Sequence, residues 1–191
     1  PHLLKDLNVP VYATKFTMQV VMDMLKDENY DLEDLTLNTI SQNSIIKFGN
    51  VRVTFFSTTH SIPESVGIAV HTLDGAIVYT SDFTFDQSGD VKYQTDFRKI
   101  NELAEKNVLA LLTESLGSTL ELNGGVNDTL MHKLNSVYTN ADGRIIVSLF
   151  SSDLRKIQRI VDISLAQNKK IAIIGRRAQR IVDIAIEDGY L

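Results

Sequence analysis

The sequence predicts a mixed α/β protein whose first part is built on antiparallel strands and whose second part is built on a parallel sheet. Gly49-Asn50 and Asp74-Gly75 are hairpin turns between apolar segments, which indicates antiparallel pairing across residues 45–82. The uninterrupted apolar run at 108–112 is typical of a strand covered on both faces. Strand-like and helix-like segments alternate after it, as the right-handed crossovers of a parallel sheet require.

The elements of the first part follow from the spacing of apolar residues. Residues 9–13 have the composition of a short strand, and Thr14 is placed to cap a helix over 15–26. A polar stretch follows, with a short strand expected around 35–37. The apolar segments beside the two turns predict strands at 45–48, 51–56, 67–73 and 76–80.

The second part alternates helices with strands. Apolar residues three and four apart predict helices over 96–106, from a cap at Asn127 or Asp128 to Tyr138, from an opening at 151–153 to about 168, and over 176–187. Short apolar runs predict strands at 108–112, 144–150 and 170–174. A loop over 116–126 and the change of pattern place a domain boundary near Ser118, which gives domains at 1–118 and 119–191.

The composition excludes several classes of protein. Hydrophobic residues make up 43% and charged residues 23%, as in an ordinary globular protein. The absence of cysteine excludes disulfides and thiolate metal sites, and it fits a reducing cytosol, so we expect a cytoplasmic protein. No apolar run approaches the roughly 20 residues of a membrane helix. The net charge of -5 argues against a globally basic nucleic-acid-binding surface, although a local groove can be basic on an acidic protein.

The ends of two predicted strands carry the first candidate site. His60 follows the strand at 51–56, and Asp82 follows the strand at 76–80. Strands of one sheet can bring an imidazole and a carboxylate to the same edge, and this pair suits Zn²⁺ or Mn²⁺. Plainer interpretations stay open, with His60 as an ordinary loop residue and Asp82 as the start of a turn. The sequence therefore predicts half of a metal site.

Polar residues after later strands give further candidates. Glu114 follows the apolar run, at the edge where α/β proteins bind ligands, although a local cap or salt bridge is the plainer interpretation and the one that the residue alone favours. Ser151 and Ser152 open a predicted helix, where they suit either a phosphate or plain N-capping. Basic residues line one side of each of the last two predicted helices, which gives either a local positive patch or two solvated faces; they are Arg155, Lys156 and Arg159, then Arg176, Arg177 and Arg180.

Three segments, at 55–67, 77–86 and 142–152, resemble the ribonuclease J family of bacterial nucleases. The segment around His60 is highly specific for this family, and the resemblance extends in order over almost the whole chain. It implies that residues 1–118 are part of a metallo-β-lactamase αββα sandwich. Residues 119–191 would then be the first half of a Rossmann-like β-CASP domain. The first four residues, which begin without Met, resemble the helix after the family's HxHxDH metal motif, so we expect an internal fragment of a longer protein.

The resemblance also implies an activity. The family cuts RNA endonucleolytically and from the 5′ end, with two metal ions at the join of its domains. His60 matches a ligand of one ion, Asp82 matches the carboxylate that bridges both, and Glu114 falls at an acidic β-CASP position. Ser152 falls in a turn that faces the RNA backbone. Expected cofactors are therefore Zn²⁺ or Mn²⁺, and expected partners are RNA and a paralogue in a homo- or hetero-oligomer.

Several departures from the family pattern lower the expected activity. The HxHxDH motif and the later His motifs would lie outside this chain, so we expect weak metal binding and no hydrolysis by these residues alone. Ser81 stands where the family has Gly, and Asp153 where it has Asn. These changes favour the second, weakly active paralogue.

Three hypotheses about function remain at this point. In the first, the chain is part of an RNA hydrolase that acts in RNA decay and maturation. In the second, it is a non-catalytic scaffold or RNA-positioning subunit of a nuclease complex. The third, a β-lactamase-fold hydrolase of small molecules, fits poorly because simple members lack the strand and helix repeats.

Overall fold

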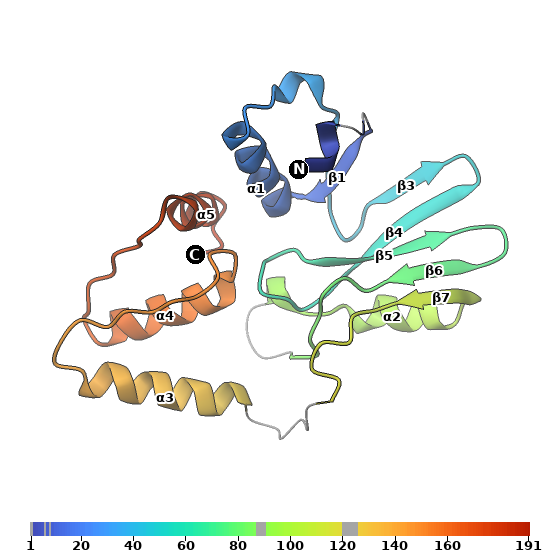
Figure 1. Cartoon of the computed structure of the whole chain (residues 1–191). Helices are drawn as coiled ribbons and strands as arrows, with labels where there is room; N and C mark the ends of the chain where they lie inside the picture. The colour runs from blue at the N-terminus through green and yellow to red at the C-terminus, as the bar shows by residue number, and fades with distance from the viewer. Residues whose placement is uncertain (1, 6, 8, 87–90, 120–125) are drawn as a thin grey trace.

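The computed structural model describes residues 2–5, 7, 9–86, 91–119 and 126–191. Figure 1 shows a sheet with helix α2 on one side of the molecule and helices α1, α4 and α5 grouped on the other. The five-stranded sheet has the order β3-β4-β5-β6-β7. Its strands are β3 (Ile45–Phe48), β4 (Val51–Ser57), β5 (Val66–His71), β6 (Ala76–Tyr79) and β7 (Val108–Leu112). A two-stranded sheet pairs β1 (Val11–Thr14) in parallel with β2 (Leu37–Ile40).

The helices complete this framework. The α-helices are α1 (Lys15–Asp27), α2 (Phe97–Ala104), α3 (Val126–Asn140), α4 (Leu154–Ala166) and α5 (Arg176–Glu187). Short 3-10 helices lie at His2–Lys5, Leu32–Asp34 and Val91–Tyr93. The predicted α/β class is confirmed, with antiparallel pairs from β3 to β6 and a parallel pair between β6 and β7. Within the described part of the chain, no helix is long and apolar enough to cross a membrane.

Both predicted hairpins form around their glycines. Gly49 has a φ of 58° in the turn between β3 and β4, where Phe48 faces Val51. Gly75 has a φ of 152°, and its carbonyl accepts a hydrogen bond from the Thr72 N–H at 2.8 Å. Glycine adopts such angles without the clash that a Cβ atom causes, so the turn residues fix these pairings locally.

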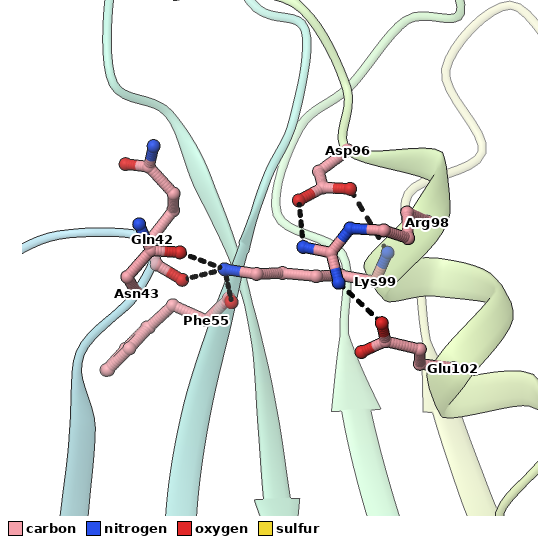
Figure 2. Close-up of polar contacts among 7 residues, drawn as sticks. All are labelled: Gln42, Asn43, Phe55, Asp96, Arg98, Lys99 and Glu102. Carbon is pink, nitrogen blue, oxygen red and sulfur yellow. Dashed lines mark hydrogen bonds and ion pairs between the residues drawn. The ribbon is translucent and has the colours of Figure 1, made fainter.

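Helix α2 covers one face of the sheet. Leu103 packs in a buried cluster with Phe56, Ala69 and Val78, and Ile100 lies against it. Lys99 fastens the helix to the edge of the sheet, because its ammonium donates to Asn43 Oδ1 (2.8 Å) and to the carbonyls of Gln42 and Phe55. Figure 2 shows these contacts beside Asp96, the N-cap of α2, whose carboxylate accepts from the Lys99 N–H.

A second core joins helices from both predicted domains. Phe16 of α1 packs with Leu154 of α4 and with Ile181 and Ala185 of α5, and all four side chains are buried. Ile62, in the loop after β4, packs against this cluster. The boundary at Ser118 stays a prediction, but the helices on its two sides share one hydrophobic core.

The prediction that β7 is covered on both faces is wrong. Every residue of the strand is exposed, with Leu111 at 61%, and β7 is the last strand in the order of the sheet. Residues 144–150 and 170–174 are not strands, and Ile146 and Ile174 in them are more than 90% exposed. A strand exists only through hydrogen bonds to a neighbour, and these apolar segments have no strand beside them among the described residues.

Two predicted caps also differ. Thr14 occupies the N-cap position of α1 but makes no capping hydrogen bond, and its hydroxyl contacts Thr17 Oγ1 instead. Helix α3 begins at Val126, so Asn127 and Asp128 lie inside it rather than at its cap. Residues 120–125, in the predicted loop before this helix, lie outside the described residues.

Candidate functional site

His60 and Asp82 meet at one edge of the five-stranded sheet. His60 Nε2 lies 3.8 Å from Asp82 Oδ2, and the two side chains are 33% and 68% exposed. Strands β4 and β6 both run antiparallel to β5, so they run in the same direction and end at the same edge. The predicted convergence of these two side chains is therefore present, while their role as metal ligands stays a prediction.

The backbone around His60 is fixed, although its ring is accessible. Thr59 is fully buried, and its N–H donates to Thr95 Oγ1 at 3.0 Å. Its carbonyl accepts from the Thr84 N–H at 2.8 Å, which ties the loop after β4 directly to the loop that carries Asp82. Ser61 Oγ lies 3.4 Å from His60 Nδ1, the ring nitrogen that faces away from Asp82.

Asp82 follows a residue with an unusual backbone angle. Ser81 has a φ of 59°, in the left-handed region that favours glycine. Phe83, the residue after Asp82, donates its N–H to Glu114 Oε1 at 3.0 Å. Glu114 therefore lies beside the Asp82 loop, but one of its oxygens is engaged in a local contact of the kind expected from its plainer interpretation. Its catalytic role stays a prediction.

The arrangement supplies two donors for a metal ion. Two ligands of one tetrahedral zinc, each about 2.1 Å from the metal, lie about 3.4 Å apart. The separation of 3.8 Å between His60 Nε2 and Asp82 Oδ2 needs only a small side-chain rotation to match this value. No group of three or more His, Asp or Glu side chains with metal-binding geometry occurs in the described ranges. The residues fit half of a metal site.

Arg155 links helix α4 to this edge. Its N–H donates to the Ser61 carbonyl at 3.2 Å, so the first turn of α4 touches the residue after His60. Its guanidinium lies 2.9 Å from Asp86 Oδ2 and 5.7 Å from the centre of the Tyr93 ring. The Arg155 side chain is only 16% exposed, and a phosphate would have to compete with the Asp86 carboxylate for it.

The two serines before α4 do not cap it. The N-cap is Asp153, whose carboxylate accepts from the Lys156 N–H (3.1 Å) and pairs with the Lys156 ammonium (2.7 Å). Ser151 is half-buried and Ser152 is exposed. N-capping therefore falls on Asp153, and the predicted phosphate-binding role of Ser151 and Ser152 is still open.

The arginines of α5 face a different partner. Arg180 Nε lies 3.2 Å from Asp23 Oδ2 of α1, and the same guanidinium pairs with Asp27. The hydrogen bond from Arg180 holds the pKa of the Asp27 carboxyl below its ordinary value. Arg177 donates to Met24 Sδ of α1, and Arg176 is exposed at the first position of α5. Arg177 and Arg180 thus pack against α1 rather than joining Arg155 in one basic patch.

The sequence analysis missed Glu64. This residue has a φ of 58°, and its carboxylate accepts a hydrogen bond from the Phe16 N–H at 3.1 Å. The only sequence signal is a carboxylate directly after Pro63, four residues beyond His60. Its partner lies 48 residues away, and no local pattern predicts such a contact.

The chain is similar to known proteins over nearly all of its length. Residues 142–191 match the family model described as "Ribonuclease J, beta-CASP domain". The proteins named "Ribonuclease J 2" from Staphylococcus aureus (strain NCTC 8325 / PS 47) and Staphylococcus saprophyticus are each 34% identical over 189 residues, which is 99% of this chain and 34% of theirs. The chain thus spans about a third of the length of these relatives.

A solved structure, titled "Crystal Structure of a Protein of Unknown Function from Enterococcus faecalis V583", also matches. It has a TM-score of 0.61 and 16% identity, over 95% of this chain and 44% of that one. At this identity the likeness concerns the fold alone.

Proposed function

Since the chain belongs to the ribonuclease J family, we propose that it forms part of a metal-dependent RNA hydrolase that acts in RNA decay and maturation. The observation that carries this proposal is the approach of His60 Nε2 to Asp82 Oδ2 at 3.8 Å on one edge of the sheet. The proposed substrate is RNA, cut both internally and from its 5′ end. The proposed location is the cytoplasm, and a paralogous ribonuclease J chain is the proposed oligomeric partner.

His60 and Asp82 are the proposed metal ligands. An imidazole and a carboxylate suit Zn²⁺ or Mn²⁺, and a metal held here would activate a water and stabilise charge on the scissile phosphate. His60 must be neutral to bind through Nε2, with Nδ1 turned toward Ser61 Oγ. The buried Thr59 and the hydrogen bond from Thr84 N–H to its carbonyl hold the two ligand loops together.

Glu114 is the proposed catalytic acid or base of this edge. Its contact with the Phe83 N–H places it next to the Asp82 loop. Ser151, Ser152 and Arg155 are proposed to contact RNA phosphates, because the N-terminal turn of α4 reaches the Ser61 carbonyl. Arg176 is proposed as an outlying phosphate contact.

A non-catalytic subunit is the second candidate function. The residue before Asp82 is Ser81, held at a φ of 59° where glycine is preferred, and Asp153 places a carboxylate, paired with the Lys156 ammonium, beside the proposed phosphate path. The Asp153 carboxylate takes up the Lys156 ammonium and the N-terminus of α4, two groups that would otherwise attract an anionic substrate. The name of the relatives, Ribonuclease J 2, also supports the second paralogue as the better assignment.

The deciding experiment is RNA hydrolysis by a longer ribonuclease J protein that contains this sequence. We expect His60→Ala to lower turnover at least ~100-fold, as the loss of a catalytic metal ligand does. Asp74→Asn, in the exposed hairpin turn, is the matched control and should leave turnover unchanged. Equal turnover in the His60 variant would remove His60 from the mechanism, and a longer protein without hydrolytic activity would favour the non-catalytic subunit.

A further inference from the structure

The loop that follows His60 is anchored at four consecutive residues. The Ser61 carbonyl accepts from the Arg155 N–H of α4, and Ile62 packs against the core shared by α1, α4 and α5. Pro63 is fully buried, and Glu64 contacts α1 through its carboxylate. The backbone beside His60 is therefore placed by helices that are distant in the sequence, while the imidazole stays 33% exposed.

Glu64 caps helix α1 in place of Thr14. Its Oε2 accepts from the Phe16 N–H, one of the first-turn donors that has no partner within the helix. The Thr14 hydroxyl makes no capping bond, so the carboxylate from the loop after β4 takes over this task. A negative charge is also favourable at the N-terminus of a helix. The left-handed φ of 58° at Glu64, uncommon for a residue with a side chain, turns the carboxylate toward α1.

The same carboxylate lies beside the segment after α5. Burial, and then the neighbouring Glu64 carboxylate, raise the pKa of the Tyr190 phenol. The Tyr190 ring packs edge-on against Phe16, with ring centres 5.6 Å apart. Asp188 adds a second link, because its Oδ1 lies 2.7 Å from the Lys15 ammonium of α1. Glu64 thus connects three segments: the His60 loop, the start of α1 and the end of α5.

We infer that Glu64 is the positioning residue of the proposed metal site. Through Phe16 and Tyr190, it holds the His60 loop at a fixed position relative to α1 and α5. Loss of this carboxylate would release the loop, move the His60 imidazole relative to Asp82 and weaken their joint hold on a metal ion. The link between Glu64 and the loop is a property of the fold, while its consequence for metal binding rests on the proposed function.

The test uses NMR on the chain with the variants Glu64→Ala, Glu64→Gln and Tyr190→Phe. Glu33→Gln, which removes an exposed carboxylate, is the matched control. The ring signals of His60 report the loop, and those of His71, which hydrogen-bonds Thr54 Oγ1 within the sheet (2.9 Å), report whether the sheet is intact.

We expect the His60 signals to shift in each Glu64 and Tyr190 variant while the His71 signals stay in place. The Phe16 amide should exchange at least about tenfold faster in Glu64→Ala, because a charge-assisted hydrogen bond is lost. Unchanged His60 signals in a folded Glu64→Ala chain would overturn the inference. If Glu64→Ala does not fold, Tyr190→Phe is the deciding variant, because it removes only the hydroxyl beside the carboxylate. Unchanged His60 signals in that variant would overturn the inference equally.

Paramagnetic broadening by added Mn²⁺ separates this inference from the proposed function. We expect Mn²⁺ to broaden the His60 and Asp82 signals of the native chain, and the broadening to decrease several-fold in Glu64→Gln but not in Glu33→Gln. Native chain without broadening at His60 would count against the metal role alone, since the shift of the His60 ring in the variants does not involve metal. Broadening that is equal in the native chain and in Glu64→Gln would overturn the positioning role.

Discussion

Leu154→Ala is the strongest test of the core that joins the two parts of the chain. Leu154 is 0% exposed and packs with Phe16, Ile181 and Ala185. The change removes about three buried methylene equivalents, worth about 2.4 kcal/mol at about 0.8 kcal/mol each. The cavity left behind adds about 1 kcal/mol because helices on different segments relax only partly. We therefore expect the free energy of unfolding to fall by about 3–4 kcal/mol.

Urea unfolding followed by circular dichroism and tyrosine fluorescence measures this loss, since the chain has six Tyr and no Trp. Ile174→Ala is the control, because this side chain is 91% exposed and its removal should change stability by less than about 0.5 kcal/mol. Hydrogen exchange adds a local measurement: amides of α1 should exchange faster in Leu154→Ala, since α1 and α4 share the core. A loss below about 1 kcal/mol, or protection of α1 that is unaffected by the change in α4, would refute the shared core.

Three further predictions concern single positions. Gly67→Ala should destabilise the chain by about 1–3 kcal/mol in urea unfolding, because the added Cβ would lie 2.2 Å from the Phe56 ring, whereas Gly143→Ala meets no atom within 4 Å and should be near neutral. Ser81→Gly should stabilise it by about 0.5–1 kcal/mol, since glycine relieves a φ of 59° at some cost in chain entropy; a loss of stability would show that the angle is not strained. Burial and two neighbouring cations lower the pKa of His71 in the folded chain below the ordinary histidine value of 6.5. As the pH falls below 6.5, His71 therefore takes up a proton in the unfolded chain before it does so in the folded chain. Stability should be full above pH 6.5 and decline as pH falls through the lower folded pKa, and His71→Gln should flatten that decline; an equal slope in the variant would assign it to other groups.

The elements that the sequence predicts well are those with local causes. Gly49 and Gly75 adopt angles that suit glycine, so the hairpins follow from the turn residues themselves. Once those hairpins alternate the strand direction, the strands before His60 and Asp82 must end at one edge. The proximity of the two side chains was therefore predictable by counting strands, without any knowledge of the packing.

The elements that the sequence predicts poorly depend on distant partners. The apolar segments at 144–150 and 170–174 have the pattern of buried strands, but this pattern does not indicate which strand would pair with them. The cap of α1 is similar, because Thr14 is a suitable residue in the right place, yet Glu64 provides the hydrogen bond from 48 residues away. Glu114 and Arg155 lie beside the Asp82 and His60 loops, but no local pattern in the sequence indicates their partners Phe83 and Asp86.

The position of α4 bears on how the two parts of the chain depend on each other. Its first turn holds the residue after His60 through the bond from Arg155 N–H to the Ser61 carbonyl, and its Leu154 fills the core beneath Ile62. His60, a proposed metal ligand, thus lies in the first predicted domain, but the backbone beside it is held in place by α4 of the second predicted domain. A substitution that weakens the packing of α4 or α5 should therefore change the position of the His60 ring, although it lies outside the His60 loop. The metal affinity of the proposed site should accordingly depend on how tightly these helices pack.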